Sequence, residues 1–346
     1  GTGDEDARRR LDLVLYWYDD STKYNCRSEC CMRMKQSIVT VTLNPAIDQT
    51  VFVDRLELGA VHRVRESQRQ AAGKGVNVAT MLALGGVDGV LATGFLGEDN
   101  AALYEQHFAA YGIEDAFVRV SGETRTGIKI VDTGANTNTD LNMPGPTPTA
   151  QQCEALKARL LKLAEPGRWF VIAGSLPAGV EASYVAGLIH ALRARGAKIA
   201  VDSSGSAMVA AVEAGIDLAK PNEHELAELL GAELNTTAEI LEAARKLRRE
   251  RIPNLIVSMG GEGAVFLSET AELQARAPEV EVVSTVGAGD SLLAGYLHGL
   301  LNGESPQDCA RRATVYAWSR LESLVPKLPQ GDERLRRVRV TDLAVE

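Results

Sequence analysis

The sequence predicts an α/β fold, a doubly wound and mainly parallel β-sheet with a small β-sheet lid. Apolar strand-like segments alternate with helical patterns along most of the chain, which is the order expected of a parallel sheet covered by helices on both faces. Two further segments, 50–66 and 125–143, alternate apolar and polar residues with period 2. The 346 residues are 45% hydrophobic and 24% charged, a composition typical of a globular protein with a large core.

The strand-like segments are short and apolar, and the helical patterns between them are longer. Strands are expected at 38–43, 89–94, 168–173, 198–202, 216–219 and 254–259. Helices are expected at 75–85, 99–111, 149–164, 181–195, 205–214, 222–230, 236–250, 288–301 and 305–319. We expect them to form one domain over residues 38–346.

The two period-2 segments each resemble a β-hairpin, because turn residues interrupt the alternation. Together they could form a small extra sheet. Both fall between elements of the main sheet, so we expect the extra sheet at its edge, as a lid built from about 50–66 and 125–143. A lid in this place would exclude water during group transfer.

The first 37 residues carry no clear periodicity, and they contain Cys26, Cys30 and Cys31. We interpret residues 1–37 as an N-terminal extension and assign it no function. A zinc site in the cysteine trio is disfavoured, because no histidine lies near it and a tetrahedral site needs four well-spaced ligands. The five cysteines fit reduced thiols better than a disulfide framework, and the five histidines show no metal-ligand spacing.

The formal net charge of -9 argues against non-specific binding to nucleic acid or to an acidic membrane face, since both need a basic surface. An anionic substrate would need a local basic cluster. The chain has no apolar run of about 18 residues, and its charged first residues differ from a secretory signal. We therefore expect a cytoplasmic protein.

The most informative segment is EVVSTVGAGDSLLAGYLHGL at 281–300. It predicts an apolar strand, a turn at Gly287, Ala288, Gly289 and Asp290, and an amphipathic helix. Such a turn directs backbone N–H groups and the positive end of a helix dipole at one point, which makes an anion site. Asp290 beside it would suit phosphoryl transfer, with a base for the attacking hydroxyl and donors for the transferred group. The alternative is a tight turn with Asp290 as a helix cap, and no P-loop motif is present.

Two other segments offer candidate ligand contacts. In QAAGKGVNVATMLALGG, Gly73 and Gly75 would let the backbone approach a ligand, Lys74 adds charge and Asn77 lies in the first helical turn, although a solvated lysine at a glycine-rich helix start explains the pattern too. In LNPAID, Asn44 and Asp48 surround a proline turn at the carboxyl edge of the first strand. Asp48 could grip sugar hydroxyls or stabilise the turn.

Two later segments have simple structural explanations beside the functional ones. KPNEHELAELLG predicts a strand end and a helix with Asn222 as its N-cap and Glu225 in the capping-box position. VSMGGEGAVFL places a glycine turn between two apolar strands, as in a plain hairpin or as a wall for a flat nucleotide base.

Taken together and in this order, these segments resemble the PfkB carbohydrate-kinase family, which has a ribokinase-like fold, from Ile38 to about Pro329. The motifs that carry the resemblance are VTLNPAID, AAGKGVNVA, AGSLPAGV, DSSG, KPNEHE, VSMGGEGA and STVGAGDS. They look most like the 1-phosphofructokinase branch. The resemblance implies ATP-dependent phosphorylation of fructose 1-phosphate at its C6 hydroxyl, giving fructose 1,6-bisphosphate. The same branch also includes kinases of tagatose 6-phosphate and fructose 6-phosphate, and a sugar-phosphate-binding sensor without turnover is a further alternative.

The resemblance also implies roles for individual residues. Asp290 would be the catalytic base, and the amides of Ala288, Gly289 and Asp290 would form the anion hole for the γ-phosphoryl group. The sugar phosphate would be held by Asp48, Gly73, Lys74, Asn77, Arg125 and Ser175, with Arg63 in the lid reaching a neighbouring subunit's site. The nucleotide would contact Lys220, Asn222, Ser258, Gly260 and Gly263, with Glu225 organising Mg²⁺ through water. A homodimer formed through the lid is expected, and an exposed β-face is a reason for it.

Overall fold

The computed structural model describes residues 38–135 and 137–343. The predicted extension over residues 1–37, with its cysteine trio, lies outside the described residues. The described residues all fall in one compact unit, in which Cys153 and Cys309 are free thiols. Among the helices of the described part, none combines the length and apolarity that crossing a membrane requires.

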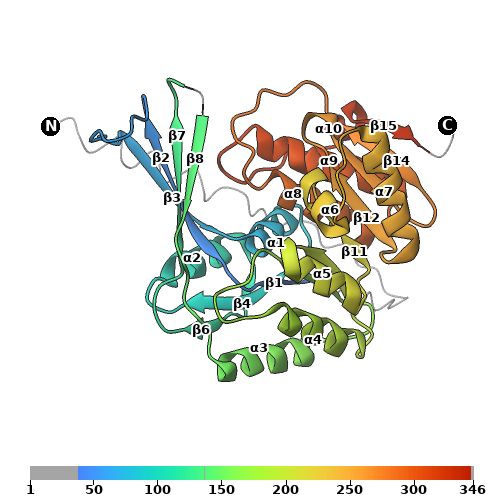
Figure 1. Ribbon diagram of the computed structural model, residues 1–346, viewed down its shortest axis with the longest axis horizontal. Helices are drawn as coiled ribbons and strands as arrows, with labels where there is room; N and C mark the ends of the chain where they lie inside the picture. Colours follow the sequence, from blue (N-terminus) through green and yellow to red (C-terminus); the bar gives the residue numbers. More distant parts are fainter. Residues whose placement is uncertain (1–37, 136, 344–346) are drawn as a thin grey trace, which may run out of the picture. The chain divides into compact units, whose positions relative to one another are not determined.

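The main sheet is mostly parallel, as predicted (Figure 1). Its strands in the described residues run in the order β15-β14-β13-β12-β11-β10-β9-β1-β4-β5, and β6 also pairs with β4. The pairs from β5 to β12 are parallel, whereas β13, β14 and β15 add an antiparallel edge. The bounds are β1 Val39–Thr42, β4 Leu91–Gly97, β5 Glu114–Asp115, β6 Val118–Val120, β9 Trp169–Ala173, β10 Lys198–Asp202, β11 Leu218–Ala219, β12 Asn254–Ser258, β13 Ala264–Leu267, β14 Glu272–Arg276 and β15 Arg339–Asp342.

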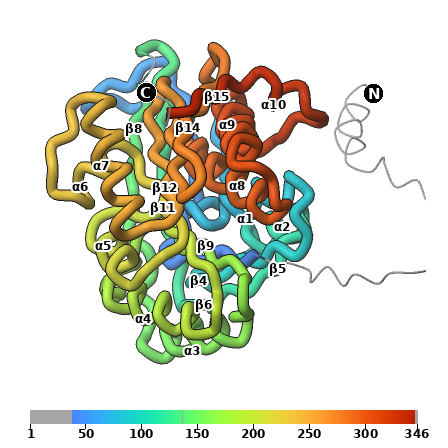
Figure 2. The backbone as a smooth tube through the Cα atoms, turned by 90° about the vertical axis from the view of Figure 1, so that its right-hand side faces the viewer, coloured from blue at the N-terminus to red at the C-terminus, as the bar shows by residue number. Residues whose placement is uncertain are grey.

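Helices cover both faces of this sheet, and each face has its own apolar core (Figure 2). Side chains of α1, α2, α8 and α9 form one core, and those of α3 to α7 form the other. The bounds are α1 Lys74–Leu84, α2 Ala102–Tyr111, α3 Ala150–Leu163, α4 Ala182–Arg193, α5 Gly205–Ala214, α6 Glu223–Leu230, α7 Thr237–Glu250, η1 Gly260–Glu262, α8 Ala288–Leu301, α9 Pro306–Leu321 and α10 Glu333–Arg337. The fold is therefore the predicted doubly wound α/β architecture.

The predicted extra sheet is present, with the strand order β3-β2-β7-β8. Its strands are β2 Ala46–Val53, β3 Glu66–Ala72, β7 Thr126–Asp132 and β8 Thr137–Asn142. The parallel pair of β2 and β7 joins two antiparallel hairpins. In Figure 1 these strands extend away from the main sheet.

The hairpin expected at 50–66 was misplaced. The strands that pair are Ala46–Val53 and Glu66–Ala72, and the residues from 54 to 65 form an irregular connection. The apolar side chains that suggested a strand there, Leu58 and Val61, are 101% and 93% exposed. Their alternation has no partner strand to pair with, so period 2 alone was misleading.

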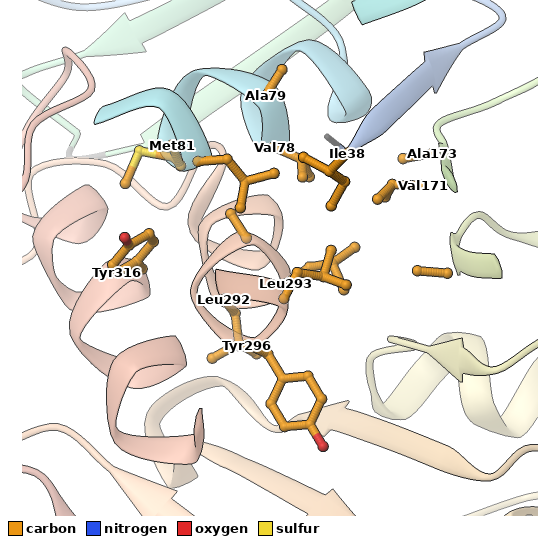
Figure 3. Packing of buried hydrophobic residues seen from close by; sticks show 14 of the residues in the cluster. Ile38, Val78, Ala79, Met81, Val171, Ala173, Leu292, Leu293, Tyr296 and Tyr316 are labelled. Atoms are coloured by element: carbon orange, nitrogen blue, oxygen red, sulfur yellow. The ribbon is translucent and has the colours of Figure 1, made fainter. Parts of the chain in front are cut away.

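The segment before Gly287 also differs from the prediction. Residues 277–286 form no strand, and Val282 and Val283 are each 54% exposed. The N–H group of Val283 donates to the carbonyl of Leu321 instead of to a strand (2.8 Å). The helix that follows, α8, is not amphipathic, because it is buried on all sides from Asp290 to Gly299. Figure 3 shows Leu292 and Leu293 of α8 among apolar side chains of its neighbours.

Candidate active site

The turn at the start of α8 is the centre of the candidate site. Gly287 is the N-cap residue and has a φ of 76°, a left-handed conformation that favours glycine. The first i→i−4 hydrogen bond of the helix runs from the N–H of Ser291 to the carbonyl of Gly287. The N–H groups of Gly289 and Asp290 precede that bond, so they lie at the positive end of the helix dipole. The N–H group of Ala288, which was also expected in the anion hole, donates to the carbonyl of Thr285 instead (3.3 Å). This geometry is that of an anion site.

Asp290 lies in this turn and is only 6% exposed. Its Oδ2 accepts a hydrogen bond from Nδ2 of Asn77 on α1 (2.7 Å). Burial raises the pKa of Asp290 to about 6, and the nearby Asp202 carboxylate adds to the increase, whereas Asn77, Lys74 and Lys220 oppose it. A carboxyl group with a pKa near 6 can take up a proton at neutral pH, as a general base must.

Two lysines meet at a buried carboxylate next to this turn. Asp202, at the end of β10, is fully buried and pairs with Nζ of Lys74 at 2.9 Å and with Nζ of Lys220 at 3.2 Å. The first contact is a hydrogen bond, whereas the second is an ion pair without hydrogen-bond geometry. Despite burial, the two lysines hold the pKa of Asp202 below its ordinary value. Asp202 is therefore charged at neutral pH.

Lys220 touches the turn itself. A Cβ atom added to Gly289 would lie 3.2 Å from Nζ of Lys220, so the ammonium group fills the space beside the glycine backbone. The site thus combines a helix N-terminus, a neighbouring ammonium group and a carboxylate with a raised pKa. This combination can hold a phosphoryl group and remove a proton from a hydroxyl that attacks it.

The residues predicted to contact the nucleotide lie at or just after the ends of β11 and β12. Asn222 caps α6 and forms the predicted capping box with Glu225, and it also makes a parallel bridge with Ser258 at the end of β12. The glycine turn between β12 and β13 contains Gly260 and Gly263, with φ values of 51° and 82°. A Cβ atom added to Gly260 would meet nothing within 4 Å, so this part of the turn is open to a ligand.

Of the predicted sugar-binding residues, Asp48 lies near the start of β2, Arg125 just before β7 and Ser175 just after β9. Asp48 is not in a turn but in β2, where Nζ of Lys129 lies 3.6 Å from its Oδ2. Arg125 immediately precedes β7 and donates a long hydrogen bond to Asn142 (3.5 Å), while its buried Nε has no partner among the described residues. Ser175 accepts a hydrogen bond from Asn44 (3.1 Å). An unsatisfied buried donor is costly, so the Nε of Arg125 suits a ligand that would satisfy it.

Gly73 and Arg63 are the two remaining residues for which the structure gives a distinct placement. Gly73 is the N-cap of α1 with a φ of 124°, and a Cβ atom there would approach Thr42 to 2.9 Å, so its role is at least structural. Arg63 is exposed in the connection between β2 and β3. The structure does not join it to the other predicted residues by any hydrogen bond or ion pair within the described part of the chain.

Sequence reasoning missed Asp202 and Lys129. Asp202 begins the DSSG motif, which contributed only to the family resemblance, although its position at a strand's carboxyl end was a usable signal. Lys129 occupies an alternating position in a predicted hairpin, where nothing in the local pattern distinguishes it from a solvated lysine. Only the pairing of β2 with β7 brings it to Asp48.

A divalent cation fits this site only when water and substrate phosphates supply most of its ligands. Within the described residues, no group of three or more His, Cys, Asp or Glu side chains could hold a metal ion directly. Mg²⁺ usually keeps several waters and binds one or two carboxylates together with substrate phosphates. The half-buried Glu225 carboxylate, 3.8 Å from Nζ of Lys74, fits such a water-mediated role.

Comparison with known proteins agrees with this arrangement. The model of the pfkB family carbohydrate kinases matches residues 39–323. The chain is 43% identical over 282 residues to a 1-phosphofructokinase of Vibrio cholerae, covering 82% of this chain and 88% of that protein. It is also 43% identical over 297 residues to a 1-phosphofructokinase of Rhodobacter capsulatus, covering 86% and 94%.

Solved structures give the same result. Phosphofructokinase-2 from Escherichia coli, in a structure with potassium, has a TM-score of 0.80 and 27% identity over 87% of this chain and 97% of that chain. A possible 1-phosphofructokinase from Thermotoga maritima has a TM-score of 0.78 and 26% identity over 89% and 99%. The predicted family and its ribokinase-like fold are confirmed: the chain belongs to the PfkB family of carbohydrate kinases.

Proposed function

We propose that the chain transfers the γ-phosphoryl group of ATP to the C6 hydroxyl of fructose 1-phosphate, giving fructose 1,6-bisphosphate and ADP. The observation that carries the proposal is the turn at the start of α8, where Asp290 lies beside free helix N–H groups and the ammonium group of Lys220. The 43% identity to relatives named 1-phosphofructokinase supports the choice of substrate.

In this mechanism the C6 oxygen attacks the γ-phosphorus in line with the departing ADP oxygen. A new O–P bond forms as the bond to ADP breaks, and the hydroxyl proton passes to Asp290. Asn77 holds the Asp290 carboxylate in place through its 2.7 Å hydrogen bond. The N–H groups of Gly289 and Asp290, with Lys220, stabilise the charge on the transferred group.

Asp202 sets the positions of the two lysines. Its carboxylate pairs with both Lys74 and Lys220. It therefore holds the ammonium group of Lys74 on the acceptor side and that of Lys220 beside the turn at the start of α8. Because Asp202 is fully buried, water does not screen these contacts as it would at the surface.

The acceptor sugar is held at the junction of lid and main sheet. In this proposal Asp48 accepts hydrogen bonds from sugar hydroxyls, and Ser175 and Gly73 contact the sugar. Arg125 and Lys74 neutralise the charge of its phosphate. The half-buried Arg125 side chain, whose Nε has no partner among the described residues, suits a charge-assisted bond to phosphate. A kinase for neutral sugars would have no need of this anion site.

The nucleotide lies along Asn222, Ser258, Gly260 and Gly263, with Lys220 near its phosphates. Glu225 would hold Mg²⁺ through water, and the ion when bound would neutralise charge on the β- and γ-phosphates. The same Glu225 caps α6 through the N–H of Asn222 (2.9 Å), so its carboxylate is already oriented.

The lid provides the contact in a proposed homodimer. Leu141 on β8 is 50% exposed, and an exposed β-face of this kind favours association. Arg63, which is exposed in the β2–β3 connection, would then reach the site of the partner subunit. A structure of Escherichia coli phosphofructokinase-2 is described as a tetrameric inhibited form, so assembly occurs in this family. The cytoplasmic location expected from the sequence stays a prediction.

The second candidate is phosphorylation of a hexose 6-phosphate, which the likeness to Escherichia coli phosphofructokinase-2, solved in complex with fructose-6-phosphate, favours. Coupled ADP release should be measured with ATP, Mg²⁺ and fructose 1-phosphate, fructose 6-phosphate, tagatose 6-phosphate or free fructose in turn. We expect the highest kcat/KM with fructose 1-phosphate. A higher value with a 6-phosphate would refute the substrate assignment, and no turnover with any sugar would favour a non-catalytic sensor.

A further inference from the structure

Arg320 on α9 is a buried arginine that no motif of the sequence singled out. Its exposed fraction is 9%. Within the described residues the one hydrogen bond of its side chain runs from Nη1 to the carbonyl of Ser323 (2.6 Å). Burying a guanidinium group is costly unless its charge and donors are matched. That carbonyl accepts from one of the five N–H donors of the guanidinium group. The positive charge and the other donors must therefore be matched by other groups nearby.

The guanidinium lies against the turn that carries Asp290. A Cβ atom added to Gly287 would lie 3.1 Å from Nε of Arg320 and 3.7 Å from Nδ2 of Asn77. The same Asn77 amide donates to Asp290. At the other glycine of the turn, Gly289, the neighbour is Lys220. Two cations therefore contact the transfer turn, one at each glycine.

Close packing of α9 on α8 fixes this placement. A Cβ atom added to Gly295 on α8 would lie 2.7 Å from Cα of Ala313 on α9, so the two helix backbones nearly touch. Figure 3 shows Tyr316 of α9 facing the core that α1 and α8 share. The carbonyl of Leu321 accepts hydrogen bonds from Val283 (2.8 Å) and Ser284 (3.1 Å). The end of α9 is thus attached to the loop that leads into the turn.

The two carboxylates nearest in effect to Arg320, Asp290 and Asp48, are both groups of the proposed acceptor site. Burial lowers its pKa, while Asp290, Asp48 and Tyr111 oppose that change, in that order. Asp290 on α8 and Asp48 on β2 are the two carboxylates that would face the acceptor. A sugar phosphate brings further negative charge, so a fixed cation here would favour binding and ionised carboxylates.

We propose that Arg320 is a positioning residue of the turn at the start of α8, where its buried guanidinium group, packed at Gly287 next to Asn77, supplies the fixed positive charge beside Asp290. This inference rests on the proposed function. The structural alternative is that Arg320 only closes the last turn of α9 through Ser323. A merely structural arginine would affect stability without moving the pH dependence of turnover.

The groups that face the two carboxylates determine the expected sign. Around Asp290 these are Asp202 of β10, Lys74 and Asn77 of α1, and Lys220 after β11. Around Asp48 these are Lys129, Arg125 and Asp140 of the lid. Asp202 raises the pKa of Asp290, and the positive charge of Arg320 acts in the opposite direction. Without that charge the pKa of Asp290 should rise further. The acid limb of kcat should then move to higher pH.

The test compares Arg320→Gln and Arg320→Lys with Arg312→Gln. Arg312 lies on the same helix and pairs with Glu304 instead of with the site. For Arg320→Gln we expect a fall of roughly ten-fold in kcat/KM for the sugar phosphate on the acid limb, the scale of a pKa change of about one. The KM for ATP should change less than about two-fold, well under that ten-fold scale. Arg320→Lys should keep the wild-type pH profile, and so should Arg312→Gln.

An unchanged pH profile in folded Arg320→Gln, or equal losses for ATP and sugar phosphate, would overturn the proposal. If the glutamine variant does not fold, Arg320→Met serves as the neutral replacement, because its side chain tolerates apolar burial. Failure of both neutral variants to fold would also overturn it, since a structural role would then suffice. Wild-type turnover tests the proposed function separately, because the comparison uses whichever sugar phosphate the wild type accepts.

Discussion

Replacing Asp202 by asparagine should destabilise the protein more than any comparable surface change. The side chain is fully buried, and the Lys220 side chain that pairs with it at 3.2 Å is 5% exposed. Asparagine keeps the shape but leaves Lys220 as a buried charge without its countercharge, which costs about 3–5 kcal/mol. The Lys74 side chain is 37% exposed, so its pair adds at most about 1 kcal/mol. A fall in Tm of roughly 5–9 °C corresponds to this loss in a chain of this size.

Asp217→Asn is the matched control. Asp217 also pairs with two cations, Arg193 at 3.3 Å and Lys198 at 3.1 Å, but their side chains are 42% and 51% exposed. Solvent screens such pairs, so this variant should lose about 1 kcal/mol or less. Calorimetry at pH 7 compares the two. Equal falls in Tm for the two variants would refute the argument from burial.

The pH dependence gives a second readout for Asp202→Asn. The folded-state pKa of Asp202 is lowered, so its stabilisation is present above the ordinary value near 3.8 and is lost as the pH falls through the folded value. The contribution of the Asp202 pairs to the stability difference between wild type and variant should thus shrink below about pH 4. Because Asp202 also raises the pKa of Asp290 to about 6, the difference should change between about pH 4 and 7 as well and be constant only above about pH 7. For the same reason the acid limb of kcat/KM should move to lower pH. That is opposite to the effect of Arg320→Gln.

Two further variants separate the acceptor and nucleotide sides of the site. Arg125→Ala should raise the KM for fructose 1-phosphate by roughly ten-fold or more, about 1.4 kcal/mol, and leave the KM for ATP nearly unchanged; equal effects on both substrates in steady-state assays would point to a lid or folding defect instead. Glu225→Gln should alter the Mg²⁺ dependence of turnover without weakening sugar binding, because glutamine can keep the capping box of α6. A Mg²⁺ titration that matches the wild type would contradict the role of Glu225.

The sequence predicted the elements that local patterns determine. The six main-sheet strands and nine helices that were predicted all appear within a few residues of their expected places, because apolar periodicity and capping are local signals. The capping box of Asn222 and Glu225 is present as predicted. Family membership followed from motif order, which no single motif could supply.

What the sequence did not reveal depends on contacts between distant elements. Arg320 follows no local pattern, and only the packing of α9 on α8 brings it to Gly287. Residues 281–286 are apolar like a strand, but the end of α9 supplies their hydrogen-bond partner. The β2–β3 hairpin starts earlier than its alternation suggested, because its register is set by pairing of Ala46 with Ala72.

The central claim is that Asp290 accepts the hydroxyl proton, and Asp290→Asn tests it. Burial and Asp202 raise the folded-state pKa to about 6 from 3.8, so ionising Asp290 costs stability as the pH rises through this range. Asparagine resembles the neutral form, so the variant should be more stable at pH 8 by up to about 3 kcal/mol and equal to the wild type near pH 4. A stable fold would make a loss of activity attributable to chemistry.

The decisive measurement is turnover of Asp290→Asn with saturating ATP and fructose 1-phosphate, with binding of each substrate followed by calorimetry. We expect both substrates to bind with near wild-type affinity while kcat falls by at least about two orders of magnitude, the usual scale for removing a positioned base. Turnover close to the wild-type value would contradict the account of the site.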